Sequence, residues 1–314
     1  MVGRVKAHGY TLLLCCALLL AGCVSGLSPL LPQTGWPVHN FASVINGAVL
    51  EELQGSGFEM LVVDISFDGG PEGNYSPEQI DGLKNAGKLP ICYLSVGEAE
   101  EYRFYWNPEW KSDPPPWLGE ENPNWEGNYK VRYWFEDWQQ IILAYLDQVV
   151  QNGFSGIYID IIDAFYYWSE EEGEVSMAFA AGEMIDFVAR LAQHVASSTR
   201  DDPFRVIIQN GLEIFDYDGE DVLLGCIDGV GVESLFFEPG GEPAQDIAFR
   251  LGYLDWLQEQ GKQVFVIDYL YDQPLEEERI ELFVQQATQR GFIPYVAHAD
   301  QSLSSLVVIP GVQP

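Results

Sequence analysis

The sequence predicts a single (β/α)8 barrel, and two patterns lead to that prediction. Strand-like and helix-like segments alternate along the chain, which is typical of a parallel sheet with helices outside it. Eight segments are strand-like, and that number favours a closed barrel over an open doubly wound sheet. The 314 residues, of which 47% are hydrophobic, are enough to bury the core of one such barrel.

Each predicted strand is a short apolar run, as expected for strands covered on both faces. The predicted strands are residues 39–43, 59–66, 89–96, 156–161, 205–209, 227–233, 263–269 and 292–297. The predicted helices are residues 47–54, 77–86, 136–151, 175–199, 244–260 and 275–290. Prolines (Pro77, Pro243) lie near two helix starts, and glycines (Gly87, Gly153, Gly261, Gly291) follow four helix ends. Because no glycine-rich phosphate motif follows a strand, nucleotide binding has no support.

The amino terminus predicts export and a lipid anchor. Arg4 and Lys6 precede a short apolar run that ends in small residues, which is typical of a secretory signal peptide and too short for a membrane span. Leu20-Ala21-Gly22-Cys23 matches the bacterial lipobox, in which the cysteine is lipidated. We therefore expect a signal peptide (1–22), a lipidated tether (23–35) and the barrel (36–314), held at the periplasmic or extracellular face of a membrane. A cleavable signal with a chance cysteine is the alternative.

The composition excludes some partners. With 48 acidic and 15 basic residues, the formal net charge is −33, which repels nucleic acid and anionic lipid head groups. Such a charge fits either a solvated surface or attraction for a cationic substrate. Cys92 and Cys226 lie in apolar contexts and are expected to be free thiols. The four histidines show no zinc-binding spacing, so we expect no cofactor.

Two predicted strands end in acids on the same face. If Asp160 points into the barrel, so does Tyr158, and if Glu233 points inward, so does Gly231. In α/β barrels the chemistry lies at this carboxyl end of the strands. A buried strand gains no stability from an unpaired acid, because desolvating a carboxylate costs free energy. We therefore predict Asp160 and Glu233 as a catalytic pair.

Further polar groups lie at or just beyond strand ends. They are Asp64, Glu98, Asp163, Asn210 and Asp268, with Tyr269 beside the last. Acids that share a rim raise one another's pKa unless cations or hydrogen bonds intervene. Such mutual effects leave one acid protonated as a proton donor and its partner ionised, as glycoside hydrolysis requires. The alternatives are helix capping, for Asp64 or Asp163, and a metal site built from these oxygens.

A long loop rich in aromatic residues is predicted after the third strand, over residues 99–134. Six of the nine tryptophans lie between residues 106 and 138, and prolines stiffen the segment. Aromatic faces stack on sugars and attract ammonium groups, so the loop is expected to form a binding wall that includes Trp134. At least half of its rings are expected to pack onto the barrel instead. Arg103 and Lys130 are cations able to orient the acids.

Three segments resemble glycoside hydrolase family 114. They are Tyr93–Arg103, Trp125–Trp134 and Gly153–Asp163, and the resemblance extends from about Trp36 to the carboxyl end. It implies a (β/α)8 barrel, endo-α-1,4-polygalactosaminidase activity, and catalytic acids on strands four and six, which correspond to Asp160 and Glu233. Ser155 departs from the acidic residue of many relatives, but it lies at the entry of its strand.

The resulting hypothesis is an exported glycoside hydrolase that cleaves an α-linked amino-sugar polysaccharide. Asp160 would be the nucleophile and Glu233 the acid/base of a retaining reaction. Substrate contacts are expected from Asp64, Glu98, Arg103, Trp134, Asp163, Asn210, Asp268 and Tyr269. The alternatives are a glycan-binding lipoprotein without turnover and a metal-assisted polysaccharide deacetylase.

Overall fold

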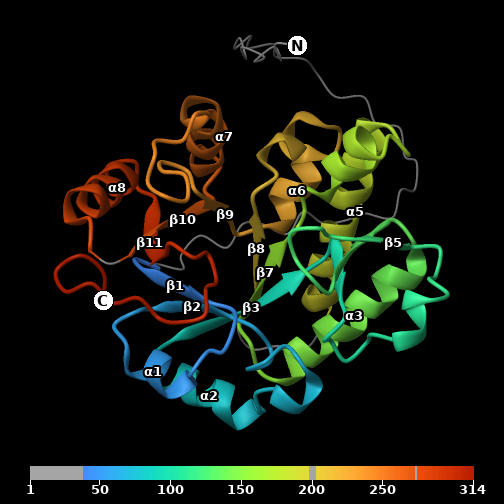
Figure 1. Cartoon of the computed structure of the whole chain (residues 1–314), viewed down its shortest axis with the longest axis horizontal. Helices are drawn as coiled ribbons and strands as arrows, with labels where there is room; N and C mark the ends of the chain where they lie inside the picture. Colours follow the sequence, from blue (N-terminus) through green and yellow to red (C-terminus); the bar gives the residue numbers. More distant parts are fainter. Residues whose placement is uncertain (1–37, 198–202, 273) are drawn as a thin grey trace, which may run out of the picture. The chain divides into compact units, whose positions relative to one another are not determined.

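Eight parallel strands form the barrel in the computed structural model, which describes residues 38–197, 203–272 and 274–314 (Figure 1). The strands are β1 (Phe41–Val44), β2 (Met60–Val63), β3 (Leu89–Ser95), β7 (Gly156–Asp160), β8 (Arg205–Gln209), β9 (Gly229–Glu233), β10 (Gln263–Tyr271) and β11 (Ile293–His298). Each pairs with the next in that order, and β1 lies beside β11 to complete the ring. The predicted fold class and all eight predicted strands are confirmed, with small shifts at the strand ends.

Helices separate the strands. They are α1 (Leu50–Gly55), α2 (Pro77–Asn85), α3 (Glu136–Gln151), α4 (Ala164–Tyr166), α5 (Met177–Ala196), α6 (Glu220–Cys226), α7 (Ile247–Glu259) and α8 (Glu277–Gln289). The six predicted helices are present, whereas α4 and α6 were not predicted. Single turns occur at η1 (Pro71–Gly73), η2 (Pro108–Lys111), η3 (Tyr167–Glu171) and η4 (Leu212–Asp216). At the start of α2, Ser76 and Gln79 form a reciprocal capping box ahead of Pro77, which satisfies two backbone N–H groups.

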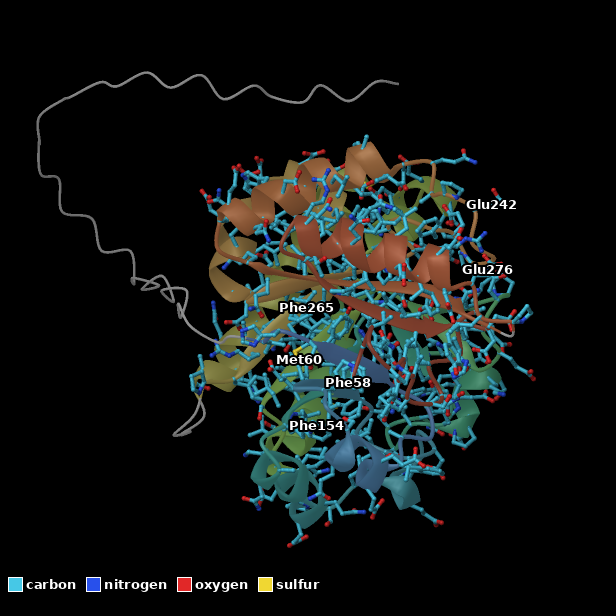
Figure 2. The ribbon with its side chains drawn as sticks, turned by 90° about the vertical axis from the view of Figure 1, so that its left-hand side faces the viewer. Phe58, Met60, Phe154, Glu242, Phe265 and Glu276 are labelled. Carbon is cyan, nitrogen blue, oxygen red and sulfur yellow. The ribbon has the colours of Figure 1, made fainter. Side chains whose placement is uncertain are left out.

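Apolar side chains fill the barrel, and many of the acids lie at its surface. Figure 2 shows Phe58, Met60 and Phe265 in the interior, each almost fully buried. Glu242 and Glu276 lie at the periphery in the same view, and both are exposed. This separation lets the strongly acidic chain keep many of its charges in solvent while the strands bury a continuous core.

The segment after β3 is not the loop predicted for residues 99–134, because it contains regular structure. Its strands are β4 (Glu98–Glu100), β5 (Leu118–Glu121) and β6 (Asn128–Val131). They form an antiparallel sheet in the order β4-β6-β5. Strands of three or four residues are too short to show a hydrophobic period, which is why the pattern missed them.

Most aromatic rings in this part of the chain pack inward. Trp117, Tyr133 and Trp138 are buried. Five more rings pack against the core: Tyr105, Trp106, Trp110, Tyr129 and Trp134. Trp125 and Tyr102 are the exposed ones, with 59% and 42% of their surface accessible. The expectation that at least half of the rings pack the segment onto the barrel is confirmed.

The predicted signal peptide (1–22), Cys23 and the tether up to residue 35 lie outside the described residues. Within the described part of the chain, Cys92 and Cys226 are free thiols, as expected. No helix there combines the length and the apolar character that crossing a bilayer requires.

Candidate active site

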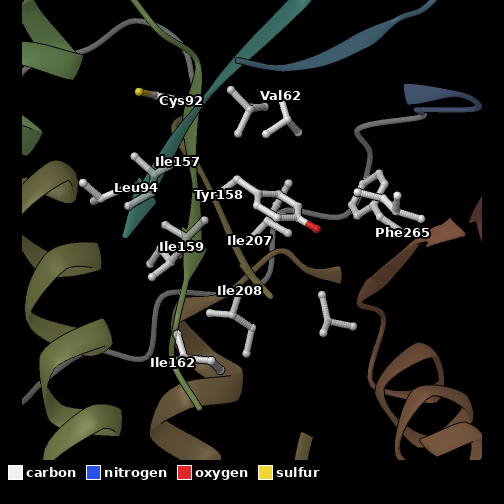
Figure 3. Close-up of a cluster of buried hydrophobic side chains, with 14 of the residues drawn as sticks. Val62, Cys92, Leu94, Ile157, Tyr158, Ile159, Ile162, Ile207, Ile208 and Phe265 are labelled. Carbon is white, nitrogen blue, oxygen red and sulfur yellow. The ribbon is translucent and has the colours of Figure 1, made fainter. Parts of the chain in front are cut away.

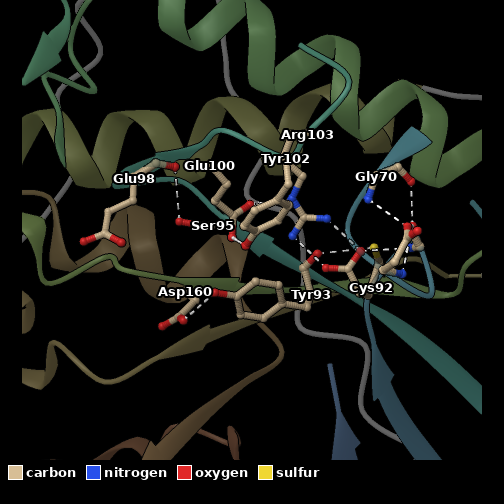
Figure 4. Close-up of polar contacts among 12 residues, drawn as sticks. Gly70, Cys92, Tyr93, Ser95, Glu98, Glu100, Tyr102, Arg103 and Asp160 are labelled. Carbon is tan, nitrogen blue, oxygen red and sulfur yellow. Dashed lines mark hydrogen bonds and ion pairs between the residues drawn. The ribbon is translucent and has the colours of Figure 1, made fainter. Parts of the chain in front are cut away.

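Asp160 ends β7 and is held by two donors. Its Oδ2 accepts a hydrogen bond from the Tyr93 hydroxyl at 2.9 Å, and its Oδ1 accepts one from the Ile161 N–H at 2.8 Å (Figure 4). Burial, and then the charge of Glu233, raise the pKa of Asp160 to about 8. At neutral pH the free protein therefore keeps a proton on this carboxyl group.

Glu233 ends β9 and has a different set of partners. Its Oε1 accepts a hydrogen bond from the Tyr269 hydroxyl, and its Oε2 accepts one from the Asn210 amide at 3.4 Å. Asn210 also accepts the Glu233 N–H at 3.2 Å, and Arg250 donates to the Glu233 carbonyl at 2.8 Å. Burial raises the pKa of Glu233, whereas Tyr269, Asn210 and Arg250 oppose the rise. The balance is a raised pKa, which suits a carboxyl group that gives up a proton near neutral pH.

The two carboxyl groups act on each other across one strand. Only β8 separates β7 from β9 in the sheet, and the charge of Glu233 is a direct cause of the raised pKa of Asp160. Two buried carboxyl groups in such proximity avoid carrying two charges at once. One proton and one negative charge can therefore coexist at this rim, which is the division that acid-catalysed cleavage of a glycosidic bond requires.

Asp163 extends the acidic rim beyond Asp160. Burial raises its pKa, the charge of Lys130 lowers it, and the charges of Glu98 and Glu233 raise it further. Lys130 lies 2.6 Å from Glu98, which is buried in the second sheet. The charge of Glu98 therefore acts on Asp163 at the rim, and Lys130 offsets the negative charges of both Glu98 and Asp163.

Glu98 is held by its neighbours in the second sheet. Besides Lys130, its carboxylate accepts hydrogen bonds from Asn122 at 2.8 Å and from Asn128 at 3.1 Å. These amides come from the β5–β6 turn and from β6. The second sheet thus fixes one acid and one cation at the mouth of the barrel, and Lys130 is one of the two cations predicted to orient acids.

The backbone is unusual where these strands end. Ile161, Asn210 and Ser234 directly follow β7, β8 and β9, and each has a positive φ, between 50° and 58°. Such a conformation is uncommon outside glycine, and for a β-branched residue such as Ile161 it is an outlier. Gly97 lies against this turn, because a Cβ there would come within 2.3 Å of the Ile161 carbonyl oxygen. Strained backbone of this kind concentrates at functional sites.

Asp64 forms a buried network with Arg103 and Glu100, and the last two are labelled in Figure 4. The Arg103 guanidinium donates to both oxygens of Asp64, at 2.7 and 2.6 Å, and to Glu100 at 2.5 Å. Asp64 and Arg103 are both only 4% exposed. Their hydrogen bonds therefore join the segments after β2 and β3, and in the described residues Arg103 orients Asp64 and Glu100 rather than the catalytic candidates.

Asp268 and Trp134 also make internal contacts. Asp268 is fully buried and accepts backbone N–H groups from Leu235 at 2.8 Å, Phe236 at 3.2 Å and Phe237 at 2.9 Å. Burial raises the pKa of Asp268 to about 7 against the effect of these bonds. Its carboxyl group thus anchors the segment after β9. The half-buried Trp134 packs edge-on against three rings, those of Tyr133, Trp168 and Phe179.

Sequence reasoning missed three groups that contact the pair: Tyr93, Arg250 and Gln209, whose side chain hydrogen-bonds Glu233. Tyr93 shares the inner face of β3 with Ser95, the residue paired with Asp160, so strand alternation could have identified it. Arg250 lies on α7, beyond an irregular segment, and no pattern placed it beside Glu233. In the described part of the chain, no three His, Cys, Asp or Glu side chains group as they would around a metal ion.

Solved structures share this fold. The glycoside hydrolase domain of PelA from Pseudomonas aeruginosa aligns with a TM-score of 0.66 and 20% identity, over 87% of this chain and 98% of that one. Ega3 from Aspergillus fumigatus, solved in complex with galactosamine, aligns with a TM-score of 0.61 and 17% identity, over 85% of this chain and 94% of that one. At these identities the likeness supports the barrel fold.

Sequence comparisons establish the family. An uncharacterised protein of Methanocaldococcus jannaschii is 41% identical over 270 residues, which are 85% of this chain and 77% of that protein. An uncharacterised protein of Thermotoga maritima is 39% identical over 297 residues, 93% of this chain and 91% of that protein. The model of glycoside hydrolase family GH114 matches residues 30–312. With a match over nearly its whole length, the chain belongs to glycoside hydrolase family GH114.

Proposed function

We propose that this protein is an exported glycoside hydrolase that cleaves an α-linked amino-sugar polysaccharide with retention of configuration, as a polygalactosaminidase does. The observation that carries the proposal is the buried pair of carboxyl groups at the ends of β7 and β9. Membership of family GH114 supports a polysaccharide substrate. The amino-sugar class is supported by the strongly negative chain and by a fold neighbour that was solved with galactosamine.

In this mechanism the pair works in two steps. Glu233 protonates the leaving oxygen while Asp160 attacks the anomeric carbon, so the glycosidic bond breaks and a glycosyl ester forms. Water then loses a proton to Glu233 and displaces Asp160 from the sugar. In a retaining enzyme the two carboxyl groups lie about 5–5.5 Å apart, and we expect this separation with the sugar bound.

The raised pKa of Asp160 favours a cationic substrate. A nucleophilic carboxylate must be ionised, yet the pKa of about 8 leaves Asp160 protonated in the free protein at neutral pH. An ammonium group bound beside Asp160 and Asp163 would lower the pKa of both carboxyl groups. An amino sugar would in this way help to ionise its own nucleophile, whereas an N-acetylated sugar would not.

The remaining predicted contacts divide into two groups under this proposal. One group lies at the pair: Asn210 and Tyr269 hold Glu233, and Asp163 contacts the sugar. The charge of Glu98 acts on Asp163. Asp64, Arg103, Asp268 and Trp134 support the rim through the internal contacts described above. Cys23 carries the lipid anchor, and mass spectrometry of the mature protein with a Cys23→Ser control tests that assignment.

Hydrolysis of α-1,4-linked polygalactosamine, in deacetylated and acetylated forms, tests the activity. Polymers of glucosamine serve as comparisons, with product sizing and NMR detection of the anomeric configuration. Asp160→Asn and Glu233→Gln should each lose about 10³-fold or more in kcat, whereas Asp81→Asn, at an exposed helix position, should not.

Three outcomes would redirect the proposal. An unaltered protein that binds the polymers and cleaves none of them would identify a glycan-binding barrel. Release of acetate that stops with a chelator would identify a metal-assisted deacetylase. Products of inverted configuration would turn Asp160 from a nucleophile into a base acting through water.

A further inference from the structure

A buried phenol below the carboxyl pair has no partner. Tyr158 lies on β7, two residues before Asp160 and on the same inner face, and it is 1% exposed. Its hydroxyl has no hydrogen-bond partner among the described residues. Burial, and the charges of Glu233 and then Asp160, raise its pKa, so the hydroxyl keeps its proton and stays a donor.

Gly231 determines where this hydroxyl lies. Gly231 is two residues before Glu233 on β9, and a Cβ at this position would lie 1.7 Å from the Tyr158 hydroxyl oxygen. The absence of a side chain at Gly231 therefore lets the phenol reach from β7 to β9, directly below the two acids. A buried hydroxyl without a partner costs free energy, so its retention at this place needs an explanation.

Apolar side chains lie around the ring. Figure 3 shows the Tyr158 ring pointing into the barrel among Val62, Ile207 and Phe265, all of them apolar and fully buried. The charges that act on the phenol are those of Glu233 and Asp160, one layer above it. The donor thus lies between an apolar layer and the pair of carboxyl groups.

The two carboxyl groups already have one phenol each. Tyr93 donates to Asp160, and Tyr269 donates to Glu233. In the retaining reaction the negative charge moves between the acids. When Glu233 gives its proton to the leaving oxygen and Asp160 bonds to the sugar, the charge passes from Asp160 to Glu233, and hydrolysis of the ester returns it. A third donor committed to neither acid is suited to such a moving charge.

We propose that Tyr158 is a positioning residue whose O–H dipole turns toward whichever of Asp160 and Glu233 carries the negative charge, from beyond hydrogen-bond distance of both. The proposal rests on the retaining mechanism proposed above. Tyr158 touches neither substrate nor the bond that breaks, and it acts through the two carboxylates. Rotation about the Cζ–O bond is sufficient, because a phenol hydroxyl reorients without moving its ring.

Tyr158→Phe removes the donor and keeps the ring. The dipole acts from beyond hydrogen-bond distance, where it is worth less than a hydrogen bond to a charged group, so kcat should fall several-fold, up to about 10-fold. Loss of a dipole that favours the charged form should also raise the pKa of Asp160, measured in the free protein by NMR of ¹³C-labelled carboxyl groups. The pH at which the rate falls on the acidic side of the pH–rate profile should rise by the same amount as the pKa of Asp160.

Tyr145→Phe is the matched control. Tyr145, on α3, is the other buried tyrosine of the described residues whose hydroxyl has no hydrogen-bond partner, and it lies beside Arg103 rather than below the pair. Its loss should leave both kcat and the pKa of Asp160 unchanged. Equal effects of Tyr158→Phe and Tyr145→Phe, or no change in the pKa with Tyr158→Phe, would overturn the proposal.

Two further measurements keep the test decisive. If Tyr158→Phe does not fold, 3-fluorotyrosine at position 158 keeps the ring and makes the hydroxyl a stronger donor, so the pKa of Asp160 should fall, and an unchanged pKa overturns the proposal. If the unaltered protein cleaves no polymer, the proposed function is wrong, and so is the transfer of charge between Asp160 and Glu233 during the reaction. The NMR titration then still decides whether the Tyr158 hydroxyl acts on the pair.

Discussion

The contact between Gly231 and Tyr158 makes a strong prediction about stability. In Gly231→Ala the new methyl group would lie 1.7 Å from the hydroxyl oxygen, 2.5 Å from Cζ and 2.9 Å from Cε2 of Tyr158. All three atoms belong to one rigid, fully buried side chain, so no flexible end can move aside. Overpacking costs about 1–3 kcal/mol, and this geometry points to the upper end, about 3 kcal/mol.

Thermal and urea unfolding measure this cost. For a chain of this size, about 3 kcal/mol corresponds to a fall in Tm of roughly 6–12 °C. Gly252→Ala is the control, because Gly252 lies within α7 and a Cβ there meets no atom within 4 Å. That substitution should stabilise the protein by about 0.4–1 kcal/mol.

A double-mutant cycle identifies the colliding group. In a Tyr158→Phe background the closest contact disappears, so Gly231→Ala should cost at least about 1 kcal/mol less than in the unaltered protein. The reasoning would be refuted if Gly231→Ala costs less than about 1 kcal/mol, or if its cost is the same in both backgrounds.

Three other predictions follow from burial. Because the pKa of Asp160 is raised to about 8, its stabilising neutral form is lost as the pH rises through that value. Asp160→Asn should therefore raise Tm increasingly from about pH 4 to about pH 8 and by a constant amount above it, and a difference independent of pH would contradict this. Arg103→Met leaves the buried Asp64 without its cation and should lower the free energy of unfolding by about 3–5 kcal/mol, where less than 1 kcal/mol would show that the network is dispensable. Trp138→Ala should cost about 3–5 kcal/mol and Trp125→Ala less than about 0.5 kcal/mol in urea denaturation. Only Trp125→Ala should weaken polymer binding in a pull-down assay, and unchanged binding would remove Trp125 from the binding wall.

The sequence predicted the barrel because its strands are buried on both faces. Such strands are apolar runs bounded by glycine, and their alternation with helices is visible without knowledge of distant contacts. The juxtaposition of Asp160 and Glu233 followed from the same logic, since the carboxyl ends of parallel strands meet at one rim.

The function of the other acids depended on contacts that no local pattern contains. Asp64 and Asp268 follow apolar runs of sequence just as Asp160 does. Their partners, however, come from afar: Arg103 lies 39 residues beyond Asp64, and the N–H groups that Asp268 binds lie 31–33 residues before it. A sequence shows which strand ends in an acid. Whether that acid contacts a cation, an N–H group or another acid, and therefore what role it has, depends on the fold.

The left-handed residues after β7, β8 and β9 carry a consequence for attempts to make the protein more heat-resistant. A strained conformation costs about 1–3 kcal/mol at each position, and Ile161 is the most unfavourable of the three. Selection for thermostability alone would be expected to place glycine at position 161, where it relieves this cost. The same change would loosen the turn that carries Asp160 and Asp163, so the more durable enzyme would be the slower one.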